Sequence, residues 1–359
     1  MIQRRKTRVV MKGNIAVGGG NPVSIQSMTK VPTTDIDATV AEVEKCRTAG
    51  VDIMRISVPD EKSLRAFKII IDKLKPSGIP IVADIHFSPK LAILSLEAGA
   101  DCIRINPGNI NDEKIVRKII EKTHDLGKSM RIGVNSGSIV PREGMHVQEI
   151  HQEINELMVA EAVRWTEFAE SLNFTNFVVS LKSSDVLQTI EVNRQAAKLL
   201  GDIPMHLGVT HAGTTQHAKR KSAIGIGTLL AEGIGDTIRV SIAGAPDEEV
   251  HFARELLADL QLRQRELDII VCPACARTVV NVEKLGLEVE KRLAELKIMT
   301  VVSILGCAVN GPGEAAESEF GIVAGKTKSW IYKNKDRVLE VANEDLVEKF
   351  ISYIVSEQS

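Results

Sequence analysis

Three cysteines near the carboxyl-terminal end of the chain stand in a pattern that is typical of metal sites. Cys272 and Cys275 form a C-x2-C pair in VCPACA, and Cys307 follows in GCAVNGPGE. Three soft thiolates select zinc or an iron–sulfur cluster over hard cations, yet closed zinc sites and cubane clusters want four ligands. The sequence therefore predicts a metal or cluster site with one position left for a ligand that is not a thiolate.

The source of this fourth ligand is open on the residues alone. All eight histidines lie at or before residue 251, so a local Cys3His zinc site is excluded. A carboxylate is one candidate: Glu314 lies seven residues after Cys307, with Glu317 and Glu319 as alternatives. Another domain, or substrate and solvent, are the other sources. A position held by a weak ligand would accept a substrate oxygen, which is expected of a catalytic cluster, whereas structural zinc or inert thiols are the plainer interpretation.

A second set of candidate functional residues consists of cations at the carboxyl ends of β-rich runs. Four runs carry an Arg between apolar residues and a fifth ends in Lys, which gives the set Arg55, Arg104, Arg131, Arg239 and Lys182. Converging cations repel one another unless they meet a polyanion, and the planar fork of Arg suits phosphate oxygens. The set predicts a small substrate with more than one phosphate group.

Any single Arg of this set could instead be structural, because ion pairs also occur inside barrels. The candidate partners are Asp52, Asp84, Asp101 and Asp236. Further polar residues at strand ends fit an acid–base or orienting role: these are Asp84 and His86 in ADIH, Asn106, Asn135, Ser136, His206 and His211.

The elements that must position these residues alternate regularly up to about residue 260. Short β-rich runs are followed by amphipathic stretches such as 37–50 and 112–127, whose apolar residues recur at i, i+3 and i+4. The expected strands are 23–28, 52–57, 80–86, 102–106, 129–135, 176–182, 204–209 and 237–242. Eight strand–helix units predict an α/β fold with a (β/α)8 TIM-type barrel over 1–262, whose mouth lies at the carboxyl ends of the strands. An open doubly wound sheet is disfavoured because no G-x-G-x-x-G follows the first strand.

Residues 263–359 differ in character and predict a separate small α+β domain. We expect a strand, a cysteine turn and a helix within 271–297, and then a strand over 299–307. A Gly/Pro-rich loop, two short strands within 320–333 and a helix over about 343–356 complete the expected domain. The cationic set thus belongs to the first domain and the clustered cysteines to the second.

The composition excludes several classes of partner. A net charge of −2 and an aromatic content of 3% argue against nucleic-acid binding. No apolar stretch is long enough to span a membrane, and the basic amino-terminal segment lacks the apolar run of a signal peptide. We therefore expect a cytoplasmic protein, in which clustered cysteines indicate metal chemistry. Cys46 and Cys102 belong to a helix and a strand of the barrel and are expected to be buried.

The motifs that carry both sites occur in a known order. SMT, ADIHF, RINPGNI, RIGVNSGS, SLKSSDV, HLGVT, KSAIGIG, EGIGDTIRVS, CPAC and GCAVNGPGEA follow one another along essentially the whole chain. In these motifs the sequence resembles the 4-hydroxy-3-methylbut-2-enyl diphosphate synthases, iron–sulfur enzymes of the non-mevalonate isoprenoid pathway. The resemblance implies a barrel followed by a ferredoxin-sulfite-reductase-like domain. It also implies a homodimer, in which the cluster domain of one subunit closes over the barrel of the other.

The resemblance further implies a reaction and a cofactor. The reaction is the reductive ring opening and dehydration of 2-C-methyl-D-erythritol 2,4-cyclodiphosphate, with electrons from flavodoxin or ferredoxin. The cofactor is a [4Fe-4S] cluster, held by Cys272, Cys275, Cys307 and the displaceable carboxylate of Glu314. The substrate-binding residues implied are Arg55, Arg104, Asn106, Arg131, Asn135, Lys182, Arg239 and Ser241. The catalytic residues implied are Glu314, Asp84, His86 and the residue at position 211.

Position 211 departs from the pattern of this family. His211 stands in THAG, where the family usually has the Glu of TEAG, a leading candidate for general acid–base chemistry. Histidine also transfers protons near neutral pH. Lys30, where Asn is common, and Ala276, after C-P-x-C, are smaller departures. These leave a divergent iron–sulfur paralog, a redox sensor or an enzyme with an altered substrate, as the alternative; without the resemblance, a zinc-stapled phosphosugar isomerase or aldolase would also fit.

Overall fold

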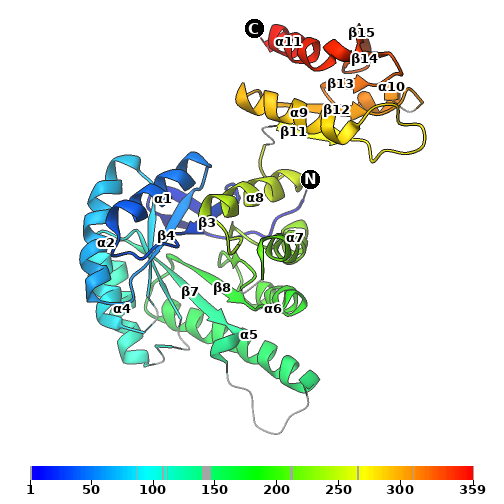
Figure 1. The fold of residues 1–359 in the computed structure, drawn as a ribbon. Coiled ribbons are helices and arrows are strands. Elements are labelled where there is room, and N and C mark those ends of the chain that lie inside the picture. Colours follow the sequence, from blue (N-terminus) through cyan, green and yellow to red (C-terminus); the bar gives the residue numbers. More distant parts are fainter. Residues whose placement is uncertain are drawn as a thin grey trace. The chain divides into compact units, whose positions relative to one another are not determined.

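A computed structural model describes residues 2–85, 87–106, 109–110, 112–139, 147–210, 213–264, 267–309 and 311–358, without the side chains of 147–151 and 312. The chain divides into two compact units, Met1–Arg263 and Gln264–Ser359. Each unit has a sheet of its own and is described here by itself (Figure 1).

The first unit is built on a parallel sheet of eight strands in the order β8-β7-β6-β5-β4-β3-β10-β9 among the described residues. A parallel bridge between Val179 and Met205 brings the two ends of this sheet together, so the sheet is nearly closed. This confirms the TIM-type barrel. The strands are β3 (Ser24–Met28), β4 (Ile53–Ser57), β5 (Ile81–Asp84), β6 (Cys102–Ile105), β7 (Ser129–Asn135), β8 (Phe177–Lys182), β9 (His206–Leu207) and β10 (Thr237–Ile238).

Helices follow the strands and cover the outside of the sheet (Figure 1). They are α1 (Ile36–Thr48), α2 (Glu61–Leu74), α3 (Pro89–Glu97), α4 (Glu113–Asp125), α5 (Val147–Ser171), α6 (Val186–Leu199), α7 (Thr215–Ala231) and α8 (Pro246–Asp259). Side-chain caps such as Asp35, Asp60 and Ser88 accept from free backbone N–H groups and so define where helices begin. The outward-facing apolar residues of the strands form one buried core with these helices.

The last two barrel strands are shorter than we expected. The runs 204–209 and 237–242 form only the two-residue strands β9 and β10. The N–H of Arg239 still donates to the carbonyl of Leu207, at 3.0 Å, but Arg239 itself lies beyond the ladder. Further on, the N–H of Thr210 bonds the carbonyl of Ser183, in the loop after β8. Beyond β9 the backbone therefore bonds to a neighbouring loop of the mouth, and the strand ladder ends.

A hairpin that we did not predict precedes the barrel. Strands β1 (Val9–Lys12) and β2 (Ile15–Gly18) pair antiparallel across a two-residue turn. Val10 and Val17 pack in one apolar cluster with residues near the amino ends of barrel strands, which are Ile53, Val82, Cys102 and Val178. The hairpin therefore covers the amino-terminal end of the barrel and seals its interior from that side.

The same hairpin carries a lysine into the barrel. Lys12 is 0% exposed, and its ammonium has no hydrogen-bond partner among the described residues. Burial, assisted by the charges of Arg131 and Arg55, lowers the pKa of Lys12 from 10.5 to about 8. A buried cation that lacks a counterion costs free energy, so Lys12 works against folding at neutral pH.

We therefore expect Lys12→Met to raise the free energy of unfolding by about 1–4 kcal/mol at pH 7. Below pH 8 the folded and unfolded chains both hold this proton, and the penalty is complete. Between about 8 and 10.5 only the unfolded chain holds it, so the stability of the wild type rises with pH and the gain from the substitution shrinks. Urea unfolding at pH 7 and 9.5 measures both effects, with exposed Lys68→Met as the control. A destabilised Lys12→Met protein would contradict the argument.

The second unit is an α+β unit with a five-stranded sheet in the order β11-β12-β13-β14-β15. Strands β11 to β13 run parallel, whereas β14 and β15 are antiparallel to their neighbours. Its elements are β11 (Leu267–Val271), α9 (Val282–Glu295), β12 (Thr300–Leu305), α10 (Gly311–Ala315), β13 (Phe320–Val323), β14 (Lys328–Lys333), β15 (Asp336–Ala342) and α11 (Leu346–Gln358).

Two elements of this unit were not predicted. Strand β15 is charged and largely exposed at the edge of the sheet, so it lacks the alternation of a half-buried strand. Helix α10 lies within the Gly/Pro-rich segment, where we expected a loop. In the part of the chain that the structure describes, no helix is both long and apolar enough to cross a bilayer.

Candidate active site

The cations predicted from the sequence lie together inside the mouth of the barrel. Arg55, Arg104, Arg131 and Lys182 belong to β4, β6, β7 and β8, and each is at least nine-tenths buried. Arg239 follows β10 directly, and its side chain is 13% exposed. Side chains of a strand point alternately to its two faces, and the flanking Ile56, Ile103 and Ile132 pack outward in the helical core. The cationic residues therefore point into the barrel.

The strand register explains how residues far apart in sequence come to the same level. Arg104 is the direct partner of Arg131 across β6 and β7, and Asp84 is the direct partner of Arg104 across β5 and β6. Asp84 is 2% exposed and lies between two cations: its carboxylate is 3.8 Å from Arg55 Nε and 3.6 Å from Arg104 Nη1. The expected pairing of an Arg with Asp84 thus occurs, but one carboxylate is shared by two guanidinium groups.

The mouth holds more positive than negative charge among the described residues. Burial is the main cause that lowers the pKa of Arg131 and of Lys182, and the neighbouring cations lower both further. Arg55 has its pKa lowered to about 10 by burial, against the opposing effect of Asp84. Within the described residues, the carboxylates that pair with these cations are Asp84 and Glu249. The mouth is therefore prepared for an anion with several negative charges.

Two glycines make room for these side chains. A Cβ at Gly133 would lie 3.0 Å from Arg104 Nε, and a Cβ at Gly208 would lie 2.7 Å from Lys182 Nζ. The second contact is shorter than carbon–nitrogen packing allows, and the carbonyl of Arg239 at 2.9 Å closes the other side. The place of Lys182 therefore depends on the missing side chain of Gly208.

We expect Gly208→Ala to displace Lys182 and to weaken binding of a diphosphate ligand roughly tenfold, since one charge-assisted contact is lost. Isothermal titration with inorganic diphosphate measures the effect. Gly227→Ala in α7 is the matched control, because its Cβ would meet Leu256 at an ordinary 3.5 Å. Unchanged affinity in Gly208→Ala would show that Lys182 does not contact the ligand.

The other predicted substrate residues lie at or beyond the carboxyl ends of barrel strands. Asn106 is buried just after β6, and Asn135 ends β7 as the register partner of Lys182. Ser241 is half-buried, three residues beyond β10, and no contact places it against the cations. His86 and His211 lie outside the described residues, so their roles stay predictions.

The structure adds partners that the sequence analysis did not include. Arg131 Nη1 donates to Gln26 Oε1 at 3.0 Å, and the guanidinium of Arg55 contacts Met28 Sδ at 2.9 and 3.1 Å. Both partners come from β3, in the run SIQSM, where they alternate with the outward-facing Ile25. The alternation of residues along this strand was the sequence signal that could have identified Gln26 and Met28 as inward-facing partners. His206 is fully buried in β9, and burial followed by the charge of Lys182 lowers its pKa strongly.

The clustered cysteines gather at one edge of the second sheet. Cys272 directly follows β11, and Cys307 follows β12 by two residues. These strands are parallel and paired up to Val271 and Ile304, so both cysteines emerge at the same edge. Cys275 lies three residues after Cys272, directly after Ala274, which takes a left-handed conformation (φ 58°). All three thiols are free and partly or fully exposed.

This donor set fits an iron–sulfur cluster in its chemistry. Cys272 Sγ accepts from the N–H of Gly306 at 3.2 Å, a contact of the kind that supports cluster sulfurs. The backbone N–H of Arg277 lowers the pKa of Cys275 and so favours the thiolate that binds iron. Among the described residues, no three His, Cys, Asp or Glu side chains are gathered tightly enough for one metal ion. In a cubane each protein ligand holds a different iron, so its ligands are more widely spaced.

One of the three carboxylate candidates is set apart by its place in the fold. Glu314 is exposed in α10, which packs against β12 and β13. Glu319 accepts from Thr300 Oγ1 at 2.8 Å, at the first residue of β12 and thus at the end of this strand opposite to Cys307. Glu317 is exposed beyond α10. The placement excludes Glu319 as a companion of Cys307, and Glu314 and Glu317, both exposed in α10 or just beyond it, stay the candidates.

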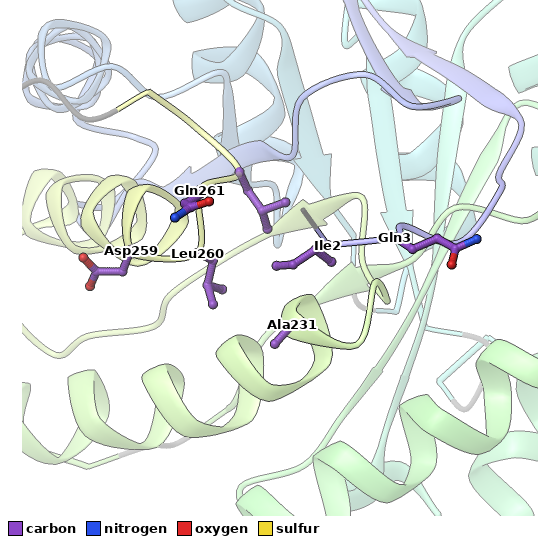
Figure 2. A pocket seen from close by; sticks show the side chains of 7 residues that line it. Ile2, Gln3, Ala231, Asp259, Leu260 and Gln261 are labelled. Carbon is purple, nitrogen blue, oxygen red and sulfur yellow. The ribbon is translucent and has the colours of Figure 1, made fainter.

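A separate pocket of about 630 Å³ lies elsewhere on the first unit. Figure 2 shows its lining residues, which are Ile2 and Gln3 of the amino-terminal segment, Ala231 and the run 259–262. Its wall is formed where α7 and α8 end and contains none of the predicted cations. The pocket is therefore not part of the candidate active site.

Comparison with family models gives two matches in chain order. A model described as the GcpE TIM-barrel domain matches residues 7–254, and one described as the GcpE protein C-terminal domain matches residues 268–356. Together they cover both units.

Relatives similar over the whole chain bear one name, 4-hydroxy-3-methylbut-2-en-1-yl diphosphate synthase (flavodoxin). The protein of Caldanaerobacter subterraneus subsp. tengcongensis is 44% identical over 356 residues, which are 99% of this chain and 98% of the relative. That of Persephonella marina is 42% identical over 354 residues, 99% of each chain. That of Aquifex aeolicus is 41% identical over 354 residues, 99% of this chain and 97% of the relative.

Two solved structures are similar to 71% of this chain. Dihydropteroate synthase from Xanthomonas albilineans matches with a TM-score of 0.50 and 16% identity over 71% of this chain and 98% of that one. Type I 3-dehydroquinate dehydratase from Clostridium difficile matches with a TM-score of 0.51 and 17% identity over 71% and 97%. At such identities the likeness shows the barrel fold alone.

Proposed function

Because the chain belongs to the GcpE family of 4-hydroxy-3-methylbut-2-en-1-yl diphosphate synthases, we propose that it opens the ring of 2-C-methyl-D-erythritol 2,4-cyclodiphosphate reductively and removes water. The product is 4-hydroxy-3-methylbut-2-enyl diphosphate. The family membership confirms the resemblance seen in the motifs. The observation that carries the proposal is the excess of buried cations at the barrel mouth, which suits a compact diphosphate.

In this proposal the residues of the mouth divide by chemistry. Residues that can donate hydrogen bonds hold the diphosphate and the ring hydroxyls: Arg55, Arg104, Arg131, Lys182, Arg239, Asn106, Asn135 and Ser241. Asp84 orients Arg55 and Arg104, and with His86 it orients or protonates groups at the ring. His211 takes the proton-transfer role for which the family generally uses a glutamate.

The reductive half of the reaction requires a redox cofactor, and we propose a [4Fe-4S] cluster on Cys272, Cys275, Cys307 and Glu314. When bound, the cluster supplies low-potential electrons and a Lewis-acidic iron. The chain contributes three thiolates at one sheet edge and a carboxylate, whose hard oxygen is a weaker ligand of cluster iron than a thiolate and is therefore easier to displace. We assign substrate binding to residues 1–262 and the cluster to 263–359.

The partners follow from the same proposal. The net reaction takes up two electrons, so a one-electron protein donor must act twice; flavodoxin, named in the relatives, or ferredoxin fits this need. A homodimer would bring the cluster domain of one subunit to the barrel of the other. The cytoplasm is the compartment in which three free thiols persist without forming disulfides.

The test is anaerobic turnover of the reconstituted protein with the cyclic diphosphate and a strong one-electron reductant, followed by phosphorus NMR. Conversion to the linear allylic diphosphate would establish the activity. An intact cluster without conversion would overturn the proposal in its present form, and recovery of conversion in His211→Glu would then favour the divergent paralog. The whole-chain relatives give this alternative no support.

A further inference from the structure

Glu249, a buried carboxylate outside the predicted site, forms a two-pronged ion pair with the mouth cation Arg239. Glu249 lies in the first turn of α8 and is 1% exposed. Both of its oxygens accept from the guanidinium of Arg239: Nε donates at 3.2 Å and Nη2 at 3.1 Å. Ser27 Oγ, at 2.9 Å, and the N–H of Ile242, at 3.2 Å, donate to the same carboxylate. These four hydrogen bonds use both carboxylate oxygens and hold Glu249 in a fixed place.

Arg239 needs such a partner because the strand does not hold it. Strand β10 ends at Ile238, so Arg239 has one backbone bond to β9 and lies beyond the ladder. The other mouth cations are on residues of longer strands. The direction of the Arg239 guanidinium is thus fixed by a two-pronged side-chain pair from a helix, a geometry that is specific as well as strong.

A third charged group completes the arrangement. Lys30 Nζ lies 3.1 Å from Glu249 Oε1 and also donates to the carbonyls of Ile242, at 2.6 Å, and of Gly244. It thereby joins the loop after β3 to the loop after β10. An isolated Arg239–Glu249 pair would be neutral, whereas the triad with Lys30 keeps one positive charge.

The net positive charge of this triad acts on the other cations of the mouth. The positive charge of Arg239 contributes to lowering the pKa of both Arg55 and Lys182, which places its guanidinium within electrostatic range of the other cations. The triad therefore connects a carboxylate in the outer helix layer with the anion-binding interior of the barrel.

We propose that Glu249 and Lys30 are positioning residues for Arg239, with Glu249 aiming its guanidinium and Lys30 offsetting the carboxylate charge so that Arg239 still attracts the diphosphate. The inference rests on the proposed function, because it gives Arg239 a diphosphate to bind. A buried ion pair by itself is weak support for a stability role, whereas a partner that fixes the angle of a ligand-binding fork affects binding and turnover directly.

The experiment is a double-mutant cycle of Glu249→Gln and Arg239→Met, with calorimetric affinity for the cyclic diphosphate as the readout. Alone, Glu249→Gln is expected to weaken binding roughly tenfold and to lower kcat about 100-fold, more than it raises KM. In the Arg239→Met background it is expected to change affinity by less than about twofold. An equal loss in both backgrounds would overturn the proposal, because a merely structural role does not depend on Arg239.

Two further variants keep the test decisive. Glu248→Gln removes the same charge from the same turn of α8 at an exposed position and should leave binding unchanged. If Glu249→Gln does not fold, Lys30→Met, whose side chain is partly exposed, carries the cycle instead. It is expected to weaken binding severalfold in the wild type and not in Arg239→Met; equal losses overturn the proposal.

Inorganic diphosphate, titrated in parallel, separates this inference from the proposed function. If the wild type binds inorganic diphosphate but not the cyclic substrate, the proposed function fails. The dependence of Glu249 on Arg239 is then measured on the inorganic ligand, with the same two outcomes.

Discussion

Replacing Cys307 by serine is expected to abolish cluster assembly. The wild type, reconstituted anaerobically, should carry about four iron and four sulfide per chain, as a cubane cluster requires. A serine hydroxyl stays protonated at neutral pH and is a hard oxygen donor, so it does not replace a soft thiolate on iron. The two cysteines of the C-x2-C turn would then be left without the ligand on the neighbouring strand. We expect iron and sulfide to fall below about one per chain and reductive turnover to fall on the order of 100-fold or more.

The barrel provides the control for this prediction. Cys46 is fully buried in α1, and burial raises the pKa of its thiol to about 12. It therefore stays a neutral apolar group, and Cys46→Ala should keep the full cluster at a small cost in stability. Iron and sulfide analysis with visible absorption reads both variants without any activity assay. Full iron and sulfide in Cys307→Ser would remove Cys307 from the ligand set, and stoichiometric zinc without sulfide in the wild type would contradict the cluster itself.

Arg104 and Lys182 lie at or next to the carboxyl ends of their strands, whereas Arg131 is the third of the seven residues of β7 and lies before the expected strand end. Arg55, Arg104 and Arg131 each stand between two apolar residues that face the helices, so alternation alone sends the Arg inward. The barrel fold also predicts a carboxyl-end position, which holds for Arg104 but not for Arg131. The shared position of Cys272 and Cys307 comes from the structure, in which each follows a strand of one parallel pair.

What the sequence analysis missed depends on contacts between distant segments. The partner of Arg131 is Gln26, separated by 105 residues, and the partner of Arg239 comes from a helix that reads as an ordinary amphipathic segment. The hairpin β1–β2 has strands of four residues each, too short for a periodic signal. Lys12, which looked like part of a basic amino-terminal segment, is buried because this hairpin packs on the barrel strands.

Replacing Arg131 by methionine is expected to stabilise the empty protein and to destroy its affinity for the substrate. Arg131 is 2% exposed, it donates to the neutral amide of Gln26, and its pKa is lowered by burial and by Arg55 and Arg104. Methionine fills a similar volume without charge. Removing the buried, repelled cation should gain several kcal/mol, and stranding Gln26 should cost about 1–3 kcal/mol. We expect a net gain of about 1 kcal/mol in the free energy of unfolding.

The loss of function should be far larger than this gain. Arg131 is the register partner of Arg104 and lies within electrostatic range of the other cations, so a bound diphosphate would lose a central charge-assisted contact. Affinity for the cyclic diphosphate should fall on the order of 100- to 1,000-fold. Calorimetry and urea unfolding, each with and without ligand, measure the two effects, and exposed Arg65→Met is the control for loss of a positive charge.

The most direct test compares the free energies of unfolding of the wild type and Arg131→Met, first without ligand and then with it. Without ligand, Arg131→Met should unfold at a higher urea concentration than the wild type. With cyclic diphosphate in large excess the order should reverse, because a ligand that binds only the folded state stabilises it by RT ln(1 + L/Kd), where L is the free ligand concentration, and the wild type has the much lower Kd. A variant that is less stable without ligand would instead make Arg131 a structural residue of the barrel interior. The expected reversal means that the mouth is assembled at the expense of the empty protein's stability, and that the substrate supplies the missing negative charge.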